Sequence, residues 1–567
     1  MTNGGNPQQV LSRRNGFHRL DGRDAQADNV AAARALSETI KTTLGPKGLD
    51  KLLVSSDGTI VVTNDGASIV DRMEIVHPAA KSIVEVAAQQ DSQVGDGTTS
   101  AIVLAGELLE EAESLLEKGL HQTTIARGYT LAAERARDTL DERTIPVAPD
   151  DRSRLRTVAR TAITGKWDRE ASDFLAEKTV AAVRAIERDG TVDLKRITRT
   201  AIPGSSYYDS ELVEGLVIDM ESSSTTPVSP EPGLPDVFED ATVALVDDQL
   251  TIETATGQGA VTLESPEDVR DLREYEQEVY ERYVDRITDA GADVVFCQKS
   301  IDDMVRYLLA KAGILAVERT RQDELEKIGR ATGASPVGTV DDLRATDTGL
   351  ARRVERRDLG PTEVAIVDGG PGVDQVSLLL RGGTQQVADE TKRVVDGCFH
   401  VLSRAIEDGA VVPGGGAMEI HLARDLREYA ANVPGREQLA VEAFADALEV
   451  IPRTLAASAG LDPIDAIVEL RARHHDGDHA AGLRLEEESG RIGDVVEGGI
   501  LEPRAVTERA IASAAEAANV IVRVDEVVAV TREEGEHEHE HEHEHGPGGV
   551  VESTEGYPWA VGHSMGH

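Results

Sequence analysis

Residues 94–100 read VGDGTTS, and a long run of helical character, AIVLAGELLEEAESLLEKG, follows directly. A helix N-terminus presents unpaired backbone N–H groups and a partial positive charge, which together favour a bound phosphate. Gly95 and Gly97 allow the backbone to approach such a group closely, and the hydroxyls of residues 98–100 add further donors. The stretch therefore predicts a phosphate site at the start of a helix.

The acidic residue between the two glycines, Asp96, does not fit a bare phosphate, because its carboxylate would repel it. A hard cation such as Mg²⁺ placed between the two removes the conflict, since carboxylates are ligands that this ion prefers. A simpler interpretation also stands at this point: Asp96 or Thr98 caps the helix, as such residues commonly do. The stretch alone leaves both interpretations open.

Two other loops lie upstream in quick succession. Residues 28–44 carry a helical apolar stripe that stops at Gly45-Pro46, a pair that ends helices. The segments KLLV, SSDG and TIVVT then predict a strand, a turn and a second strand. This hairpin leads to Asn64-Asp65-Gly66, a turn sequence that opens another helix. Up to about residue 145 the chain is expected to be mainly helical.

The composition excludes several classes of partner. The chain has 567 residues, enough for roughly three or four domains. Asp and Glu total 103 against 59 Lys and Arg, so the net charge is −44, which repels nucleic acid and anionic membranes. Aromatic residues make up only 3%, so aliphatic side chains must fill the core. This acidic excess favours a high-salt cytoplasm, where ions screen the self-repulsion.

Sequence signals for export, membrane insertion and disulfides are missing. Cys297 and Cys398 form no metal or disulfide pattern, which fits a reducing compartment. The Arg13-Arg14 pair resembles a twin-arginine signal, but polar residues follow where an apolar region is required. No apolar run reaches the roughly 18 residues of a membrane span. We therefore expect a soluble, cytoplasmic protein.

The middle of the chain differs from its ends. Residues 216–366 alternate short apolar strands with amphipathic helices, which predicts an α/β arrangement. Within it, residues 265–287 predict a long charged helix with one apolar face, which either packs on its own domain or protrudes from it. After about residue 400 the helical texture returns. A discontinuous domain built from both ends, with the α/β part inserted, is the economical arrangement.

A low-complexity tail begins at Gly535 with GEHEHEHEHEHGPGG. We expect residues 531–567 to be disordered and solvated. The alternating histidines could also bind a divalent metal weakly, although no folded scaffold fixes a ligand geometry there.

The common phosphate-binding loops, GxxxxGK[ST] and GxGxxG before a helix, do not occur. Instead, the chain carries six other motifs: TLGPKGLDKLL (43–53), VTNDGAS (62–68), GDGTTS (95–100), VVPGGGAMEI (411–420), GLDPIDAIVEL (460–470) and GILEPRAV (499–506). In order and spacing, these six motifs resemble the ATP site of group II chaperonins, the archaeal thermosome family. Further stretches, such as ADVVFCQKSID (292–302) and LLLRGGT (378–384), extend the resemblance to roughly residues 20–530.

The resemblance implies a mainly α protein with an α/β apical insertion, the chaperonin fold of three nested domains. Its predicted parts are a flexible N-terminus (1–20), an equatorial ATP-binding domain (21–145 and 403–530), an intermediate hinge domain (146–215 and 367–402), and an apical substrate-binding domain (216–366) with a helical protrusion (264–287). It also implies an ATPase that encloses and folds unfolded polypeptides in stacked rings of identical or paralogous subunits, with no nucleic acid or membrane partner.

Site residues are implied motif by motif. Asp96 would hold Mg²⁺, and Asp65 would polarise or orient the attacking water. Lys166 resembles a lysine that senses the γ-phosphate, Gly415 would let the nucleotide sugar approach, and Glu502 resembles a ribose-binding acid. The residues expected to bind ATP are Leu44, Gly45, Pro46, Gly97, Thr98, Thr99, Ser100, Lys166, Gly415 and Glu502. Taken singly, each of these residues also has an ordinary structural explanation.

One position departs from the family pattern. A second catalytic carboxylate is expected in a pattern like DExERxxxDA, but here the sequence reads DETKRVVDGCF, with Gly397 at the expected Asp and Asp396 one residue early. One step along a helix rotates a side chain by about 100°. Asp396 therefore replaces the missing group only if the helix is distorted locally, which Gly397 would favour. The alternative is an ATP-binding, weakly hydrolysing structural subunit of a mixed ring. A small-molecule phosphotransferase is disfavoured, since the middle segment shows no acceptor site.

Overall fold

The structure is a computed structural model that describes residues 17–21, 23–54, 58, 60–220, 233–252, 266–360, 362–369, 375–486, 489–524 and 526–530. It divides into two units, residues 1–21 with 526–567 and residues 22–525, which are described separately. The predicted tail, 531–567, and most of the predicted flexible N-terminus lie outside the described residues. No helix in the described ranges combines the length and apolar composition that a membrane span requires.

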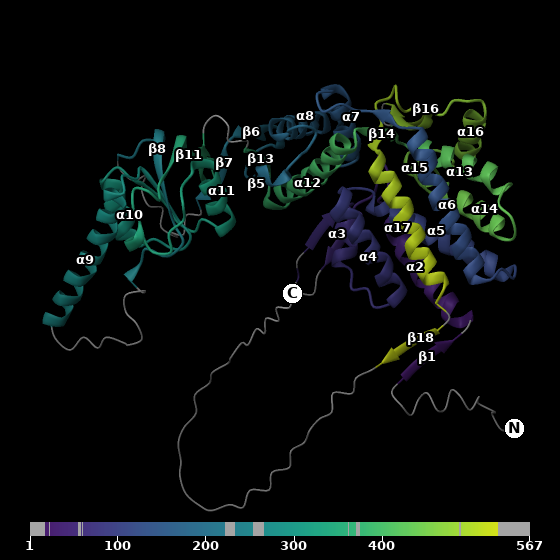
Figure 1. The fold of residues 1–567 in the computed structure, drawn as a ribbon, viewed down its shortest axis with the longest axis horizontal. Coiled ribbons are helices and arrows are strands. Elements are labelled where there is room, and N and C mark those ends of the chain that lie inside the picture. The colour runs from purple at the N-terminus through teal and green to yellow at the C-terminus, as the bar shows by residue number, and fades with distance from the viewer. Residues whose placement is uncertain are drawn as a thin grey trace, which may run out of the picture. The chain divides into compact units, whose positions relative to one another are not determined.

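Helices from both ends of the larger unit share one apolar core. Buried aliphatic residues between Val30 and Leu140 pack with others between Val412 and Val522. The helix α17 lies against α5 and α6 (Figure 1). The helices of these end segments are α2 (Arg23–Lys41), α3 (Gly66–Arg72), α4 (Pro78–Val94), α5 (Thr98–Glu117), α6 (Gln122–Glu142), α13 (Ala417–Ala430), α14 (Glu437–Leu448), α15 (Val450–Ser458), α16 (Pro463–His475) and α17 (Arg504–Val522).

Short sheets connect these helices. The predicted hairpin is confirmed as antiparallel β2 (Lys51–Val54) and β3 (Ile60–Thr63). A second hairpin pairs β15 (Ala481–Glu486) with β16 (Ser489–Asp494). In a three-stranded sheet, β14 (Ala410–Pro413) lies between β17 (Leu501–Pro503) and β4 (Ile145–Pro146). This sheet brings Glu502 beside the glycine-rich loop that follows β14.

A second core joins residues 147–197 to residues 376–411. It contains α7 (Arg152–Ala162), α8 (Arg169–Ile186) and α12 (Gln385–Asp408), which pack on one another and on a sheet in which β13 (Val376–Gly382) lies between β5 (Ile197–Pro203) and β6 (Glu211–Glu214). Two 3-10 turns, η1 (Leu194–Arg196) and η2 (Tyr207–Asp209), flank β5. Both chain segments of this core lead toward the helical ends.

The middle segment is α/β, as its sequence predicts. Its six strands follow the order β10 (Leu315–Val317), β9 (Val294–Cys297), β8 (Val237–Val246), β11 (Gly349–Asp358), β12 (Glu363–Asp368) and β7 (Leu216–Met220). The first three are parallel, and the remaining pairs are antiparallel. The helices are α9 (Pro266–Asp289), α10 (Asp303–Lys311) and α11 (Gln322–Thr332), with the 3-10 turn η4 (Val340–Asp342).

The long charged helix α9 combines the two interpretations that its sequence allows. In its second half, Val279, Tyr283 and Ile287 are buried in the core of the middle segment. Nearer its start, Tyr275 is 40% exposed, although it belongs to the same apolar stripe. The C-terminal half therefore packs on the sheet domain, and Tyr275, one turn before Val279, is partly open to solvent. The side chains of residues 266–269 and 271, and Ser265 as the predicted cap, lie outside what the structure describes.

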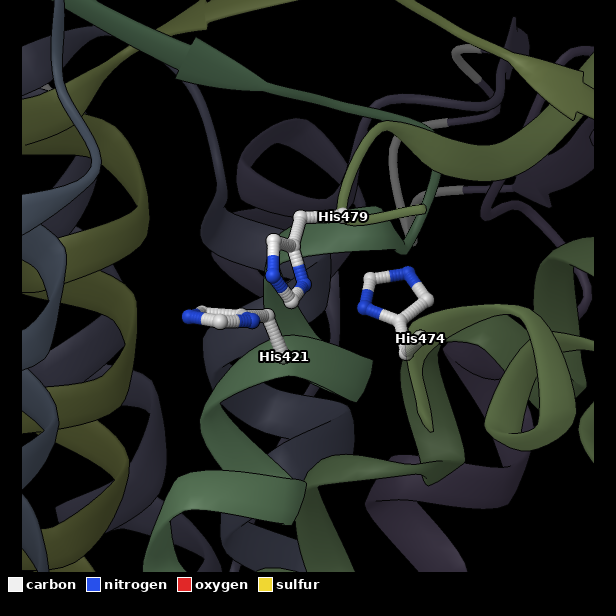
Figure 2. A group of neighbouring side chains, drawn as sticks. All are labelled: His421, His474 and His479. Carbon is white, nitrogen blue, oxygen red and sulfur yellow. The ribbon is translucent and has the colours of Figure 1, made fainter. Parts of the chain in front are cut away.

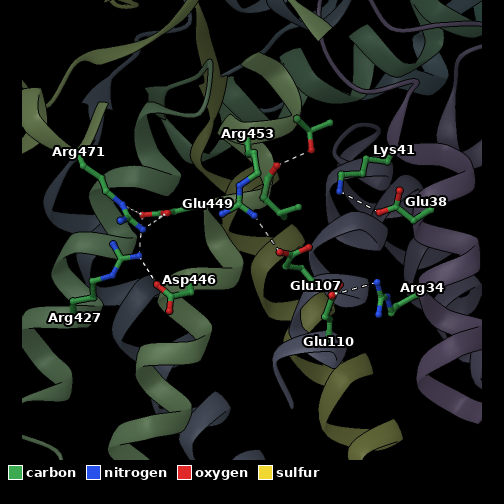
Figure 3. A network of polar contacts seen from close by, with 12 residues as sticks. Arg34, Glu38, Lys41, Glu107, Glu110, Arg427, Asp446, Glu449, Arg453 and Arg471 are labelled. Carbon is green, nitrogen blue, oxygen red and sulfur yellow. Dashed lines mark hydrogen bonds and ion pairs between the residues drawn. The ribbon is translucent and has the colours of Figure 1, made fainter. Parts of the chain in front are cut away.

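A buried acid connects the C-terminal helices. Glu449, between α14 and α15, is 1% exposed, and its carboxylate binds Arg471 at 2.5 Å and Arg427 at 2.9 Å (Figure 3). Loss of both arginines would leave the Glu449 carboxylate buried without a partner, which is strongly destabilising. This junction therefore holds α13 and α16 to the α14–α15 turn.

In the smaller unit, β1 (Phe17–Asp21) pairs with β18 (Glu526–Val530). The pairing is antiparallel, with Phe17 opposite Val530 and Asp21 opposite Glu526.

Candidate functional site

The larger unit contains a cavity of about 1140 Å³ in which the separate sequence motifs meet. Its lining residues lie between Thr43 and Ser172 and between Arg393 and Ile511, so both halves of the chain contribute to it and the middle segment does not. Every residue that the sequence singles out is among the lining residues: Leu44, Gly45, Pro46, Asp65, Asp96, Gly97, Thr98, Thr99, Ser100, Lys166, Asp396, Gly415 and Glu502. Five of the six motifs contribute lining residues, whereas the stretch 460–470 contributes none.

The loop that opens α5 shows why its sequence is rich in glycine. Gly95 and Gly97 have φ of 71° and 80°, a conformation that other residues rarely adopt. Gly97 is the N-cap of α5 and provides no side-chain cap, and the first intrahelical bond runs from Ala101 N–H to the Gly97 carbonyl at 2.9 Å. The amides of residues 98–100 precede that bond. The simple capping interpretation fails for Thr98, which is the first residue of the helix.

Asp96 accepts a hydrogen bond from the Gly97 amide at 2.6 Å, and its backbone carbonyl accepts one from Gln90 at 2.8 Å. Its side chain opens onto the cavity. Loss of water within the cavity walls raises the pKa of Asp96 to about 6, and the charges of Asp65 and Asp91 act in the same direction. Three carboxylates around one cavity disfavour one another, and a divalent cation relieves this repulsion.

Asp65 lies at the N-terminus of α3, where its carboxylate accepts a hydrogen bond from the Ser68 amide at 2.8 Å. Arg393, on α12, forms an ion pair with the same carboxylate, in which Nη1 lies 2.9 Å from Asp65 Oδ2. Burial raises the pKa of Asp65, but Arg393 and the Ser68 amide outweigh it, so the pKa is lowered. Asp65 is therefore held as a carboxylate.

Lys166 brings the second core to the cavity. Its ammonium donates to Asn64 Oδ1, beside Asp65. Burial and the nearby Arg393 lower the pKa of Lys166. The backbone also fits closely here: a Cβ added to Gly165 would lie 3.1 Å from the Pro46 carbonyl. The loops around residues 45, 65 and 165 are thus packed against one another.

Glu502, on β17, faces the loop after β14. A Cβ added to Gly414 would lie 2.7 Å from Glu502 Oε1, and Thr507 donates to Glu502 Oε2 at 3.5 Å. Burial raises the pKa of Glu502 and of its neighbour Glu419, and the charge of Glu419 raises that of Glu502 further. Gly415, with φ of 61°, sits between these acids and β15.

The two neighbouring positions on α12 point in different directions. Asp396 forms an ion pair with Arg199 on β5, with Oδ1 and Nε 2.7 Å apart. A Cβ added to Gly397 would lie 3.0 Å from the Gly95 carbonyl, and no other neighbour lies within 4 Å. The helix runs without interruption from Gln385 to Asp408. The distortion that would turn Asp396 to the place of a residue at 397 is therefore absent.

Sequence reasoning missed several residues that line the cavity. Arg393 was part of the quoted DETKR stretch, but only the fold shows that it meets Asp65. Glu419 follows the GGGAM stretch and could have been noticed as an acid at a helix start. Asp91 and His400 carry no local signal, because each lies inside a helix among ordinary polar residues.

Comparison with known proteins gives a consistent family. Residues 36–532 match the TCP-1/cpn60 chaperonin family. The thermosome subunit of Methanopyrus kandleri is 46% identical over 529 residues, covering 93% of this chain and 95% of the relative. Thermosome subunit alpha of Halobacterium salinarum is 46% identical over 526 residues, covering 93% and 92%. Thermosome subunit 1 of Haloferax volcanii is 44% identical over 525 residues, again covering 93% and 92%.

These matches extend over nearly the whole chain, which accordingly has the chaperonin fold. The chain belongs to the TCP-1/cpn60 chaperonin family, as a group II chaperonin of the archaeal thermosome type.

Proposed function

We propose that the cavity binds ATP together with Mg²⁺ and that nucleotide turnover there drives the closing of a folding chamber. As a member of its family, the chain is an ATP-dependent chaperonin subunit that folds polypeptides. The observation that carries the proposal is the meeting of motifs from residues 44 to 502 on one cavity.

The lining residues suit a magnesium-bound triphosphate. The start of α5 supplies amides that precede the first intrahelical bond, and Thr98, Thr99 and Ser100 supply hydroxyls. Glycines at 45, 95 and 97 have positive φ and leave room for a close approach of the phosphates. Asp96 would hold the ion, which supplies charge neutralisation when bound. Leu44, Gly45 and Pro46 also line the cavity and would lie against the bound nucleotide.

Two side chains near Asn64 would serve the reaction. Asp65, kept ionised by Arg393, would accept a hydrogen bond from water and orient it for attack. Lys166 would contact the terminal phosphate and report its presence to the second core, from which it comes. Glu502 and Gly415 would border the sugar, because Glu502 lies against the glycine-rich loop that holds Gly415 and both line the cavity.

The three cores support the nested domains that the family resemblance implies. The core of residues 30–140 and 412–522 corresponds to an equatorial domain, the core of residues 147–197 and 376–411 to an intermediate domain, and the sheet of residues 216–368 to an apical domain. The N-terminal part of α9, where Tyr275 is 40% exposed, would serve as the lid. Unfolded polypeptides and further chaperonin subunits in stacked rings are the proposed partners.

A second candidate function has its own support. Position 397 faces the Gly95 loop but carries no carboxylate, and Asp396 is committed to Arg199. We therefore infer that this subunit binds ATP but hydrolyses it slowly, and that it contributes wall and lid to a mixed ring.

Binding and turnover can be tested separately. Calorimetric titration with ATP, with Mg²⁺ or with a chelator, should give an affinity that depends on Mg²⁺, and Asp96→Asn should weaken it by at least about tenfold. The matched control is Asp303→Asn, an 84% exposed acid on α10 that does not line the cavity. Equal affinity for all three proteins would refute the site. Phosphate release from the same samples, and electron microscopy with and without ATP, then test turnover and ring closure.

A further inference from the structure

Three histidines from distant positions face one another outside the nucleotide cavity. His421 lies on α13, His474 near the end of α16, and His479 in the turn before β15 (Figure 2). One nitrogen from each ring lies within 4.8 Å of the others. His474 is fully buried and His421 is 7% exposed. The arrangement is produced by the fold, because α13 meets α16 only in the tertiary structure.

The hydrogen bonding of this trio is incomplete. The Nδ1 atoms of all three rings are buried and have no hydrogen-bond partner. His474 Nε2 lies 2.8 Å from the Ala481 carbonyl, so this nitrogen donates and Nδ1 retains its lone pair. Buried polar atoms in folded proteins nearly always have partners. Three such atoms lie together in this cluster, where a shared partner would satisfy them.

An exposed arginine, Arg143, determines which nitrogen of His421 carries the proton. Arg143 Nε donates to His421 Nε2 at 3.1 Å, so the neutral His421 ring carries its proton on Nδ1. A protonated Nδ1 cannot bind a metal. Arg143 is exposed and can therefore turn away into solvent. The proton then moves through water from Nδ1 to Nε2, with no net gain or loss, and Nδ1 becomes a ligand.

Positive and negative side chains both surround the three imidazole rings, which burial keeps neutral. Burial lowers the pKa of all three imidazoles, and the charge of Arg143 adds to the effect at His421 and His479. Arg424, which also lies near the trio, is positive, whereas Asp425 and Asp478 are negative and favour a cation. Neutral imidazole is the form that binds transition metals.

We propose that His421, His474 and His479 bind a divalent transition-metal ion, best matched by Zn²⁺, once Arg143 releases His421. Zinc takes histidine nitrogens at about 2.0–2.1 Å, so two ligands of a tetrahedral ion lie about 3.3 Å apart. The widest pair, at up to 4.8 Å, must therefore close by about 1.5 Å. Side-chain rotation of His479, the most exposed of the three, supplies this movement. A solvent molecule completes the ligand set.

The bound ion would connect α13 to the turn between α16 and β15. From that turn, β15 reaches the nucleotide cavity, where the Leu483 amide donates to the Gly415 carbonyl at 2.8 Å. The ion is thus a structural clamp behind one wall of the nucleotide site. Its ligands do not line the cavity.

The test uses the full chain, freed of metal by a chelator and titrated with Zn²⁺ and with Co²⁺. Cobalt in a tetrahedral site gives visible absorption bands, and zinc bound only by the folded chain raises the melting temperature. His479→Gln should weaken zinc binding by about 100-fold or more, because even the loss of supporting contacts costs 10–100-fold. The His/Glu repeat of residues 535–545 is present in every variant and contributes equally.

A second variant is expected to strengthen zinc binding, an effect that misfolding cannot produce. Arg143→Gln removes the competing donor from the surface and should tighten zinc binding by about tenfold, since a hydrogen bond to a charged group is lost. The matched control is Arg152→Gln, another exposed arginine, which lies away from the trio and should change nothing. Absence of the cobalt bands and of any rise in melting temperature, or equal zinc affinity for wild type and both His479→Gln and Arg143→Gln, would overturn the proposal. It does not depend on the proposed nucleotide site, which Asp96→Asn tests independently.

Discussion

Replacement of Gly397 by Asp should accelerate ATP hydrolysis. The Cβ direction at this position leads to the Gly95 loop, where the phosphates are proposed to lie, whereas Asp396 pairs with Arg199. An aspartate at 397 would therefore add, from α12, a second carboxylate beside Asp65.

The structure sets the size of the effect. A new Cβ would lie 3.0 Å from the Gly95 carbonyl, so the loop must yield by a few tenths of an ångström. Mild overpacking of this kind costs about 1 kcal/mol, or about fivefold in rate if all of it is felt in the transition state. A positioned general base contributes about 100- to 10,000-fold. Dividing the lower limit of about 100-fold by the packing cost of about fivefold gives an expected increase in rate of about 20-fold.

Phosphate release from saturating Mg·ATP measures the change. Gly397→Asn is the matched control, because it has the same size and the same close contact but cannot accept a proton. It should be no faster than wild type. If Gly397→Asp and Gly397→Asn hydrolyse ATP at the same rate, or if both match wild type, then a missing carboxylate at 397 does not limit turnover and the reasoning is wrong.

Three other predictions follow from the site and the charge. Asp65→Asn should lower the rate of phosphate release by about 100-fold or more with little change in Mg·ATP affinity, and an unchanged rate would exclude Asp65 as the water-orienting group. In the wild type, the stability that ionised Asp65 contributes is present above its ordinary pKa of 3.8 and is lost as the pH falls through its lowered pKa. Arg393→Gln should raise the pKa of Asp65 and so move the acid unfolding transition toward neutral pH. This shift should be absent when Asp65→Asn is also present. The melting temperature should rise between about 0.1 and 1 M KCl, because screening relieves the self-repulsion of a chain with a net charge of −44, and a flat or falling curve would contradict this.

The sequence predicts the elements of the site well because each carries a local signal. Gly95 and Gly97 adopt positive φ, Asp65 precedes a helix, and Gly45-Pro46 follows one. Each loop could therefore be predicted from its own residues. Their meeting on one cavity came from the family resemblance, not from the residues alone. The hairpin and the α/β middle segment were predictable for the same local reason.

Contacts between distant elements could not be predicted in this way. The ion pair between Arg393 and Asp65 depends on α12 reaching the N-terminus of α3, and the pairing of Asp396 with Arg199 depends on β5 lying beside α12. The histidine trio is another example, since His421 has no periodic relation to His474. The burial of half of α9 also depends on the sheet beneath it, which a helical stripe alone cannot reveal.

The division of the helical core between the two ends of the chain has a consequence during synthesis. A ribosome releases the N-terminal segment first, so α2 to α6 emerge with their apolar faces prepared for α13, α14 and α17, which are translated last. The sheet of residues 216–368 draws its core from one continuous stretch and can be completed earlier. Until α17 leaves the exit tunnel, the nascent subunit exposes apolar surface, which is the kind of surface that assembled chaperonins bind in other unfolded proteins.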